Sequence, residues 1–99
     1  MDMYEKAARS EEDRQGMIQG LLRDLEEQAK TICEGAPTHD YATLALQVAG
    51  MMTVIRIMKS FFEEFHPESP VGWHAVDTLD ELRKGLFEEM LARQEVLAG

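Results

Sequence analysis

The sequence predicts an all-α protein with three helices in an up-down-up arrangement. Apolar residues recur three and four positions apart along most of the 99 residues, and no useful length alternates with period two. Two short breaks, each containing proline, divide the chain. The connections are about four residues long, so successive helices should run antiparallel. We expect residues 1–9 to form an N-terminal arm or a helical extension, and residues 10–99 to form a single helical domain.

The first helix is predicted over residues 11–34. Ser10, with Asp13 three residues later, approximates a capping box at its start. Gly35 followed by Pro37 is the usual sequence signal for a helix end, with glycine as the C-cap. Leu21, Leu22 and Leu25 belong to the apolar stripe that this helix should bury.

The second and third helices are predicted over residues 39–65 and 70–97. Between them, the segment 66–70 contains two prolines, which the interior of a helix does not tolerate. Ser69 before Pro70 is a typical N-cap followed by a proline in the first helical position.

The apolar residues of the second helix form two arcs rather than one. Steps of about 100° per residue place the arc of the second half roughly 100° from that of the first half. The first arc comprises Tyr41, Leu44, Ala45, Val48, Ala49, Met52 and Ile55. The second arc comprises Val54, Ile57, Met58, Phe61, Phe62 and Phe65.

Two interpretations fit these arcs, because a single straight seam cannot use both. The helix is either clasped by one neighbour at each end, or it turns one arc towards a second chain. Six large apolar side chains, each worth about 1.5–3 kcal/mol on burial, are too many to leave in water. The preferred interpretation is a homodimer that closes as a four- or six-helix bundle.

The candidate partner-binding or dimer-interface residues follow from the second arc. Trp73, the sole tryptophan, joins them because it follows the proline-rich break and tryptophan often anchors interfaces. Its alternative role is to pin the connection between the second and third helices to the core. The candidate set is Val54, Ile57, Met58, Phe61, Phe62, Phe65 and Trp73.

Composition bears on several classes of function. The formal charge of −9 argues against direct nucleic-acid binding, which needs clustered Lys and Arg. The longest stretch without a charged residue, from Tyr41 to Ile55, falls short of the ~20 apolar residues that span a membrane. One cysteine and no basic start of a secretory signal lead to the expectation of a cytoplasmic protein.

Catalytic and metal-binding patterns are weak. Glu63 and His66 have the Glu-x-x-His spacing of di-iron bundles, but a complete site needs a second such pair and further inward glutamates. A histidine near a helix end is more commonly stabilised by the helix dipole. Cys33 falls on the apolar stripe of the first helix, where a thiol behaves as a small buried hydrophobe. We therefore expect no enzyme activity, no cofactor and no metal.

The run from Ala49 to Met58, AGMMTVIRIM, resembles the long helix of small all-α quorum-sensing antiactivators. That resemblance implies a helical homodimer that binds a LuxR-type receptor and blocks its activity. The residues themselves predict a small acidic regulator that sequesters or blocks a partner protein through an apolar helix face. The expected partner is a transcriptional regulator or an effector with a basic surface. The alternatives are an acidic nucleic-acid-mimicking inhibitor of a basic effector and a carboxylate-metal enzyme.

Overall fold

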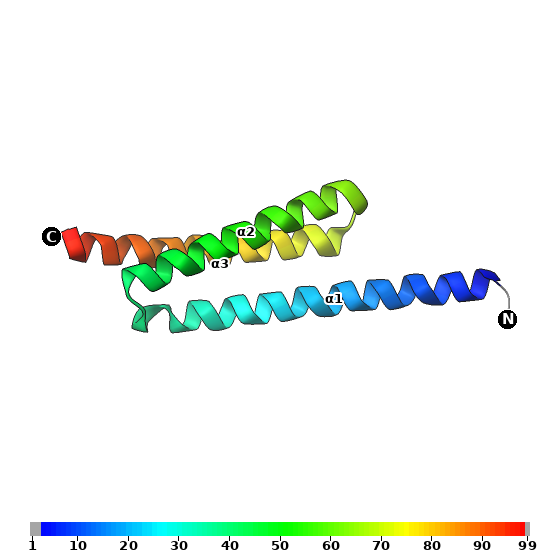
Figure 1. Ribbon diagram of the computed structural model, residues 1–99, viewed down its shortest axis with the longest axis horizontal. Coiled ribbons are helices and arrows are strands. Elements are labelled where there is room, and N and C mark those ends of the chain that lie inside the picture. Colours follow the sequence, from blue (N-terminus) through cyan, green and yellow to red (C-terminus); the bar gives the residue numbers. More distant parts are fainter. Residues whose placement is uncertain (1–2, 99) are drawn as a thin grey trace.

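The computed structural model describes the backbone of residues 3–98 and the side chains of residues 14–94. All of its regular structure is helical, and the described backbone contains no strand, so the all-α prediction is confirmed (Figure 1). The elements are α1 (Met3–Gly35), the 3-10 turn η1 (Ala36–Thr38), α2 (Tyr41–Phe65) and α3 (Pro70–Ala98).

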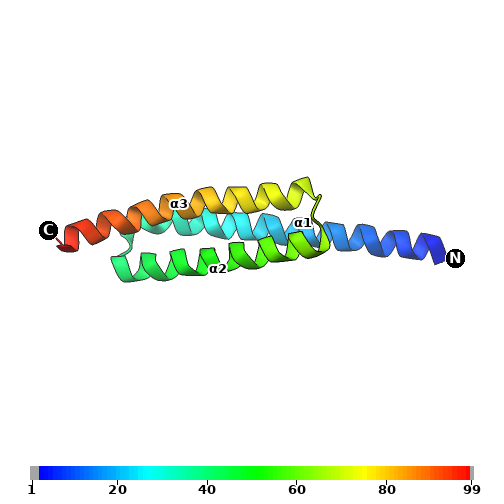
Figure 2. The same ribbon diagram turned by 90° about the horizontal axis from the view of Figure 1, so that it is seen from above.

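The helices form a rod with principal extents of 69 × 22 × 17 Å. α2 and α3 pack along each other. α1 runs lengthwise beside them and makes most of its contacts with α3 (Figures 1 and 2). α1 and α2 make few backbone contacts, and their ribbons diverge away from η1 (Figure 1). The N-terminal part of α1 continues past the ends of the other two helices (Figure 2).

Both ends of α1 differ from the sequence prediction. The helix begins at Met3 rather than at residue 11, so Ser10 lies within it and is not its N-cap. The preceding residues include good helix formers such as Glu5, Lys6 and Ala7, which allow the helix to continue through one serine. At the other end, α1 stops at the predicted break but includes Gly35, whose φ of −79° and ψ of −11° are right-handed helical values. The chain then tightens into η1.

The starts of α2 and α3 carry side-chain caps. Asp40 Oδ1 accepts a hydrogen bond from the Thr43 backbone N–H at 2.9 Å, so α2 begins two residues later than predicted. Hydrogen bonding from Thr43 holds the pKa of this carboxyl below its ordinary value. Ser69 Oγ accepts from the Gly72 N–H at 3.1 Å, which confirms the predicted cap of α3.

The core surface of α2 is one continuous seam, so the interpretation of two separate arcs is wrong. Its buried residues alternate between spacings of four and three. That is the 3.5-residue repeat of a coiled coil, in which helices wind so that one stripe stays in contact. The seam takes Leu44, Val48 and Ile55 from the first arc and Met58 and Phe62 from the second, so neither arc is buried or exposed as a whole. The seam comprises Leu44, Val48, Met51, Ile55, Met58 and Phe62.

The other two helices complete the core around this seam. α3 contributes four buried apolar side chains, those of Ala75, Val76, Leu79 and Leu86. The α1 side contributes Leu22, Ala29 and Ala36. Cys33 Sγ donates a hydrogen bond to the Leu82 carbonyl at 3.5 Å, which ties α1 to α3.

Two long side chains fasten the ends of the bundle. Arg93, near the end of α3, donates to the carbonyls of Pro37 at 3.0 Å and His39 at 3.2 Å. At the opposite end, Trp73 Nε1 donates to the Pro67 carbonyl at 2.8 Å, and its ring lies 6.2 Å from that of Phe62. Trp73 therefore pins the α2–α3 connection to the core.

An open groove between α1 and α2

The divergence of α1 from α2 leaves a groove of about 250 Å³ between them. Residues of α1 and α2 form its two walls, and Leu79 of α3 reaches it from behind. Most of the lining is apolar, with two glutamines. The lining residues are Leu25, Gln28, Ala29, Ile32, Gln47, Gly50, Met51, Val54 and Leu79.

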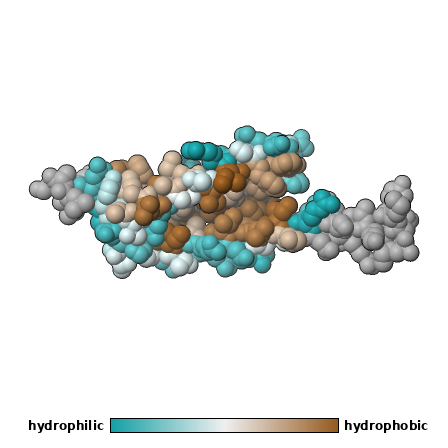
Figure 3. Space-filling view, in the orientation of Figure 1, coloured by the Kyte–Doolittle hydropathy of each residue, from teal (hydrophilic) through white to brown (hydrophobic). Residues whose placement is uncertain are grey.

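Apolar surface gathers over this groove. In the orientation of Figure 1, hydrophobic residues form a band along the middle of the molecule, between more hydrophilic margins above and below (Figure 3). Large apolar patches on a protein surface mark sites of contact with other molecules more often than chance. We therefore define the α1–α2 groove as the candidate functional site.

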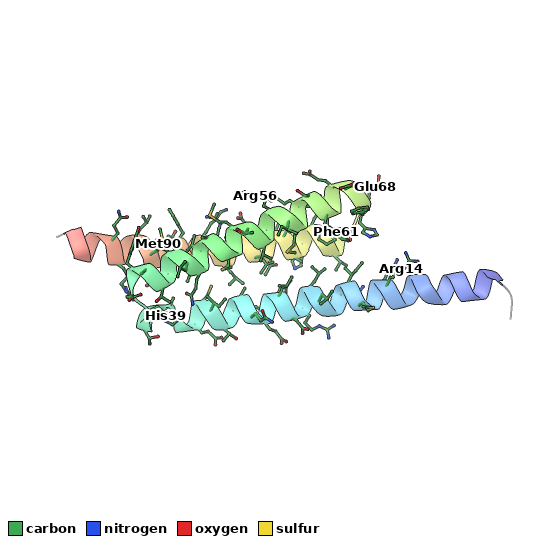
Figure 4. All side chains as sticks on the ribbon, viewed as in Figure 1. Arg14, His39, Arg56, Phe61, Glu68 and Met90 are labelled. Carbon is green, nitrogen blue, oxygen red and sulfur yellow. The ribbon has the colours of Figure 1, made fainter. Side chains whose placement is uncertain are left out.

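The α2 wall continues beyond the groove as an exposed apolar stripe. Ile57 is 63% exposed, Phe61 39% and Phe65 60%. Figure 4 shows Phe61 on the side of α2 that faces α1, whereas Arg56 lies on the far side. The Phe61 ring centroid lies 5.3 Å from those of both Phe62 and Phe65, so the stripe is anchored to the core through an aromatic cluster.

The same stripe is polar at its other end. Thr43, Gln47, Gly50, Val54 and Ile57 each precede a core residue by one position, so they share one side of α2. The stripe thus changes from polar near η1 to apolar near the α2–α3 connection.

The α1 wall is apolar apart from Gln28, since its other lining residues are Leu25, Ala29 and Ile32. Leu21, 60% exposed, and Met17, 67% exposed, lie further towards the N-terminus of α1 and are not among the lining residues. The connection through η1 sets the C-terminal end of α1 beside the start of α2 (Figure 1). The groove therefore carries Gln28 and Gln47 within an otherwise apolar lining, and Ile57 and Phe61 extend its α2 wall towards the α2–α3 connection.

One polar atom in the groove lacks a partner. Oε1 of Gln47 is buried and accepts no hydrogen bond. A buried acceptor without a donor costs about 1–3 kcal/mol, so proteins rarely leave one in the final assembly. Gly50, one turn further along α2, has nothing within 4 Å of where a Cβ would stand. The fold of this chain therefore does not require a glycine there.

The structure divides the predicted interface residues into three groups. Ile57, Phe61 and Phe65 are exposed, and Val54 forms part of the groove wall. Met58 and Phe62 are only 7% and 3% exposed, so their assignment to an outer face is wrong. They belong to the coiled-coil seam of α2. Trp73 is half-buried at the α2–α3 connection.

The spacing of apolar residues predicts most of the α1 wall, because Leu25, Ala29 and Ile32 lie on the apolar stripe of the first helix. Leu21, predicted on the same stripe, is largely exposed. Gln28, Gln47 and Gly50 carry no motif of their own. One sequence signal does point to the groove. The second helix carries two neighbouring rows of residues with heptad spacing, offset by one position, and one row faces the core while the other faces the groove.

A second hollow of about 440 Å³ lies between α1 and the α2–α3 connection. Ile18 and Leu22 line it from α1, and Phe62, His66 and Val71 line it from the other side. It shares no lining residue with the groove.

The described side chains do not form a metal site. No group of three or more His, Cys, Asp or Glu among them is arranged to hold a metal ion. His66 is exposed, and its ring packs 5.7 Å from that of Phe61. Within this part of the chain, no third potential metal ligand therefore accompanies Glu63 and His66.

Cys33 is held as a neutral thiol. Desolvation raises its pKa, and its Sγ points to the Leu82 carbonyl. We predict that Cys33 reacts with a disulfide reagent more slowly than a free thiol of a model peptide at the same pH, because less thiolate is present. The rate should rise towards the peptide value when urea unfolds the protein. Equal rates in the folded and unfolded states would contradict this assignment.

α2 also meets the length and composition criteria for a membrane-crossing helix, the one such helix among the described residues. Core helices of bundles meet the same criteria, and six side chains of α2 are packed in the seam. The observation alone is weak support for a membrane role.

Fold and site together define a class: a coiled-coil-like three-helix protein with an unfilled apolar groove between its first two helices. Comparisons with family models, curated proteins and solved structures yielded no match.

Proposed function

We propose that this chain is a small protein-binding regulator that sequesters or blocks a partner protein through the α1–α2 groove and the adjoining apolar stripe of α2. The observation that carries the proposal is the exposure of Ile57, Phe61 and Phe65 in one row beside an open groove. Burial of such side chains against a partner would contribute about 1.5–3 kcal/mol each.

The mechanism is occlusion. A partner whose own apolar dimerisation or effector surface lies against the stripe cannot use that surface elsewhere. The expected antiactivator or inhibitor role follows from this, as does a partner of the transcriptional-regulator or basic-effector type. The formal charge of −9 supports a basic partner, because opposite charge speeds encounter and selects among apolar surfaces.

The proposal includes a cytoplasmic homodimer built from up-down-up protomers. Phe87 and Leu91, 37% and 39% exposed, and Met52, 45% exposed, supply a second apolar surface on α2 and α3. A dimer that uses this surface would leave the groove free for the partner.

Phe61→Asp tests the function. Ser60→Asp is the matched control, because it adds the same charge at an exposed neighbouring position about 100° around the helix from Phe61. In affinity capture from the source cells, followed by identification of the bound polypeptides, we expect the wild type and Ser60→Asp to hold one polypeptide. Phe61→Asp should lose at least about 90% of it, as truncation of an interface hot spot does.

Circular dichroism and sedimentation of the three proteins serve as controls for folding and oligomeric state. If Phe61→Asp captures the same polypeptides as Ser60→Asp, the apolar stripe is not the binding surface and the proposal fails.

A further inference from the structure

We propose that the occupant of the α1–α2 groove is a single amphipathic helix of the partner, which completes a four-helix arrangement. This inference rests on the proposed function and adds the chemistry of the segment that is bound. The helix carries apolar side chains along one half of its contact stripe, hydrogen-bond donors along the other half, and Lys or Arg on its flanks.

The groove lies where a fourth helix of a bundle would pack. α1 and α2 both pack on α3 but diverge from each other, and Leu79 of α3 forms the floor between them. The α2 wall continues the coiled-coil repeat of its helix, one residue before the core positions. A fourth helix would meet this wall with the spacing that knobs-into-holes packing uses.

Gly50 supports a helix rather than a loop as the occupant. Glycine is less favourable than alanine inside a helix, and no neighbour among the described residues crowds the position. It lies in the wall of the groove, where a missing side chain lets another backbone approach closely. Gly16, Gly20 and Gly85 are equally open, so Gly50 is set apart by its place in the groove wall, where a docked helix can approach the backbone.

The exposed amide of Gln28 fixes the chemistry of one part of the contact. Gln28 lines the groove from α1, and its side chain is open to the groove. An Asn amide or a Ser hydroxyl on the bound helix would form a hydrogen bond with it. Beyond the groove, the exposed side chains of Ile57 and Phe61 continue the α2 wall and accept leucine or similar side chains. The bound helix therefore has one preferred direction.

The margins of the groove favour a cationic helix over a second copy of this chain. Asp24 and Glu27 adjoin Gln28 and Ile32 on the outer side of the α1 wall. Glu64 follows Phe61 by three residues on the opposite margin. At the far end Arg14 stands on the side of α1 that faces α2 (Figure 4). A second copy placed in the groove would bring its own surplus of carboxylates to these margins, whereas Lys or Arg on the flanks of a helix would pair with them.

The test uses labelled synthetic peptides of about 20 residues, which span ~30 Å as a helix. The first has leucine on half of a heptad stripe, asparagine on the other half, and lysine on the flanks. The second has glutamate in place of lysine, and the third has serine in place of leucine. By fluorescence anisotropy we expect the first to bind the wild-type protein, the second to bind at least about tenfold more weakly, and the third not to bind.

Gly50→Leu fills the groove without disturbing the fold, because a Cβ there meets nothing and leucine is a better helix former. Ser60→Leu is the control, since it adds the same side chain at an exposed position of α2 outside the groove. We expect Gly50→Leu to weaken the first peptide at least about tenfold with an unchanged or higher Tm, and Ser60→Leu to bind as the wild type does. Gln28→Met should weaken the asparagine peptide but not a version with leucine at those positions.

Three results would overturn the inference: equal affinity of Gly50→Leu and the wild type, equal affinity of the lysine and glutamate peptides, or a wild-type dimer that Gly50→Leu dissociates. The last result would assign the groove to a second copy. Capture of the cellular partner separates the two proposals. If Phe61→Asp loses the partner and Gly50→Leu keeps it, the regulator function stands and the docked helix is wrong. If both keep it, both proposals fail.

Discussion

Phe62→Ala should lower the free energy of unfolding by about 3–5 kcal/mol, whereas Phe61→Ala should lower it by about 1 kcal/mol or less. Phe62 is 3% exposed within the seam of α2, so its removal leaves a cavity next to Trp73. Phe61 is 39% exposed and forfeits chiefly its contacts with the neighbouring rings. Urea unfolding followed by circular dichroism measures both values.

The same pair separates stability from function. Phe61→Ala should fold normally yet bind the partner weakly, because its ring belongs to the exposed stripe. Comparable losses of stability in the two variants would show that the seam and the stripe of α2 are not distinct surfaces.

Gly72→Ala should destabilise the protein by about 2 kcal/mol, whereas Gly50→Ala should stabilise it by about 0.5–1 kcal/mol. A Cβ at Gly72 would overlap the ring of Phe62, which is buried and packed near Trp73 and so has little room to move. At Gly50 the added methyl meets nothing, and the helix gains the higher propensity of alanine.

Thermal and urea unfolding of the two variants beside the wild type provide the measurement, and the opposite signs are the informative result. A Gly72→Ala protein as stable as the wild type would mean that α3 does not approach Phe62 as closely as the structure has it.

Much of the fold could be predicted from the sequence, because the sequence features that mark helices and their ends are local. The proline-containing breaks, the Ser69 cap and the three-to-four spacing of apolar residues each depend on a few neighbouring residues. The predicted start of α1 is wrong for the complementary reason. Ser10 has the chemistry of a cap, but the helix-forming residues before it let the helix continue.

The candidate site could be predicted only in part from the sequence. Ile57, Phe61 and Phe65 form an apolar row in the sequence, and the structure leaves them exposed. Met58 and Phe62 cannot be separated from them by angle alone, since adjacent positions on a wide apolar arc differ by one step around the helix. The winding of α2 on α3 decides which of two adjacent stripes is buried.

The amino-acid sequence by itself determined that this protein is helical, where its helices break, and that its second helix carries more apolar surface than one seam needs. Only the tertiary structure decided that α1 packs on α3 and diverges from α2, which opens a groove along the surplus surface. The physical reason is that hydrophobic spacing encodes the face a helix buries, whereas the neighbour that covers each face depends on contacts between residues far apart in the chain.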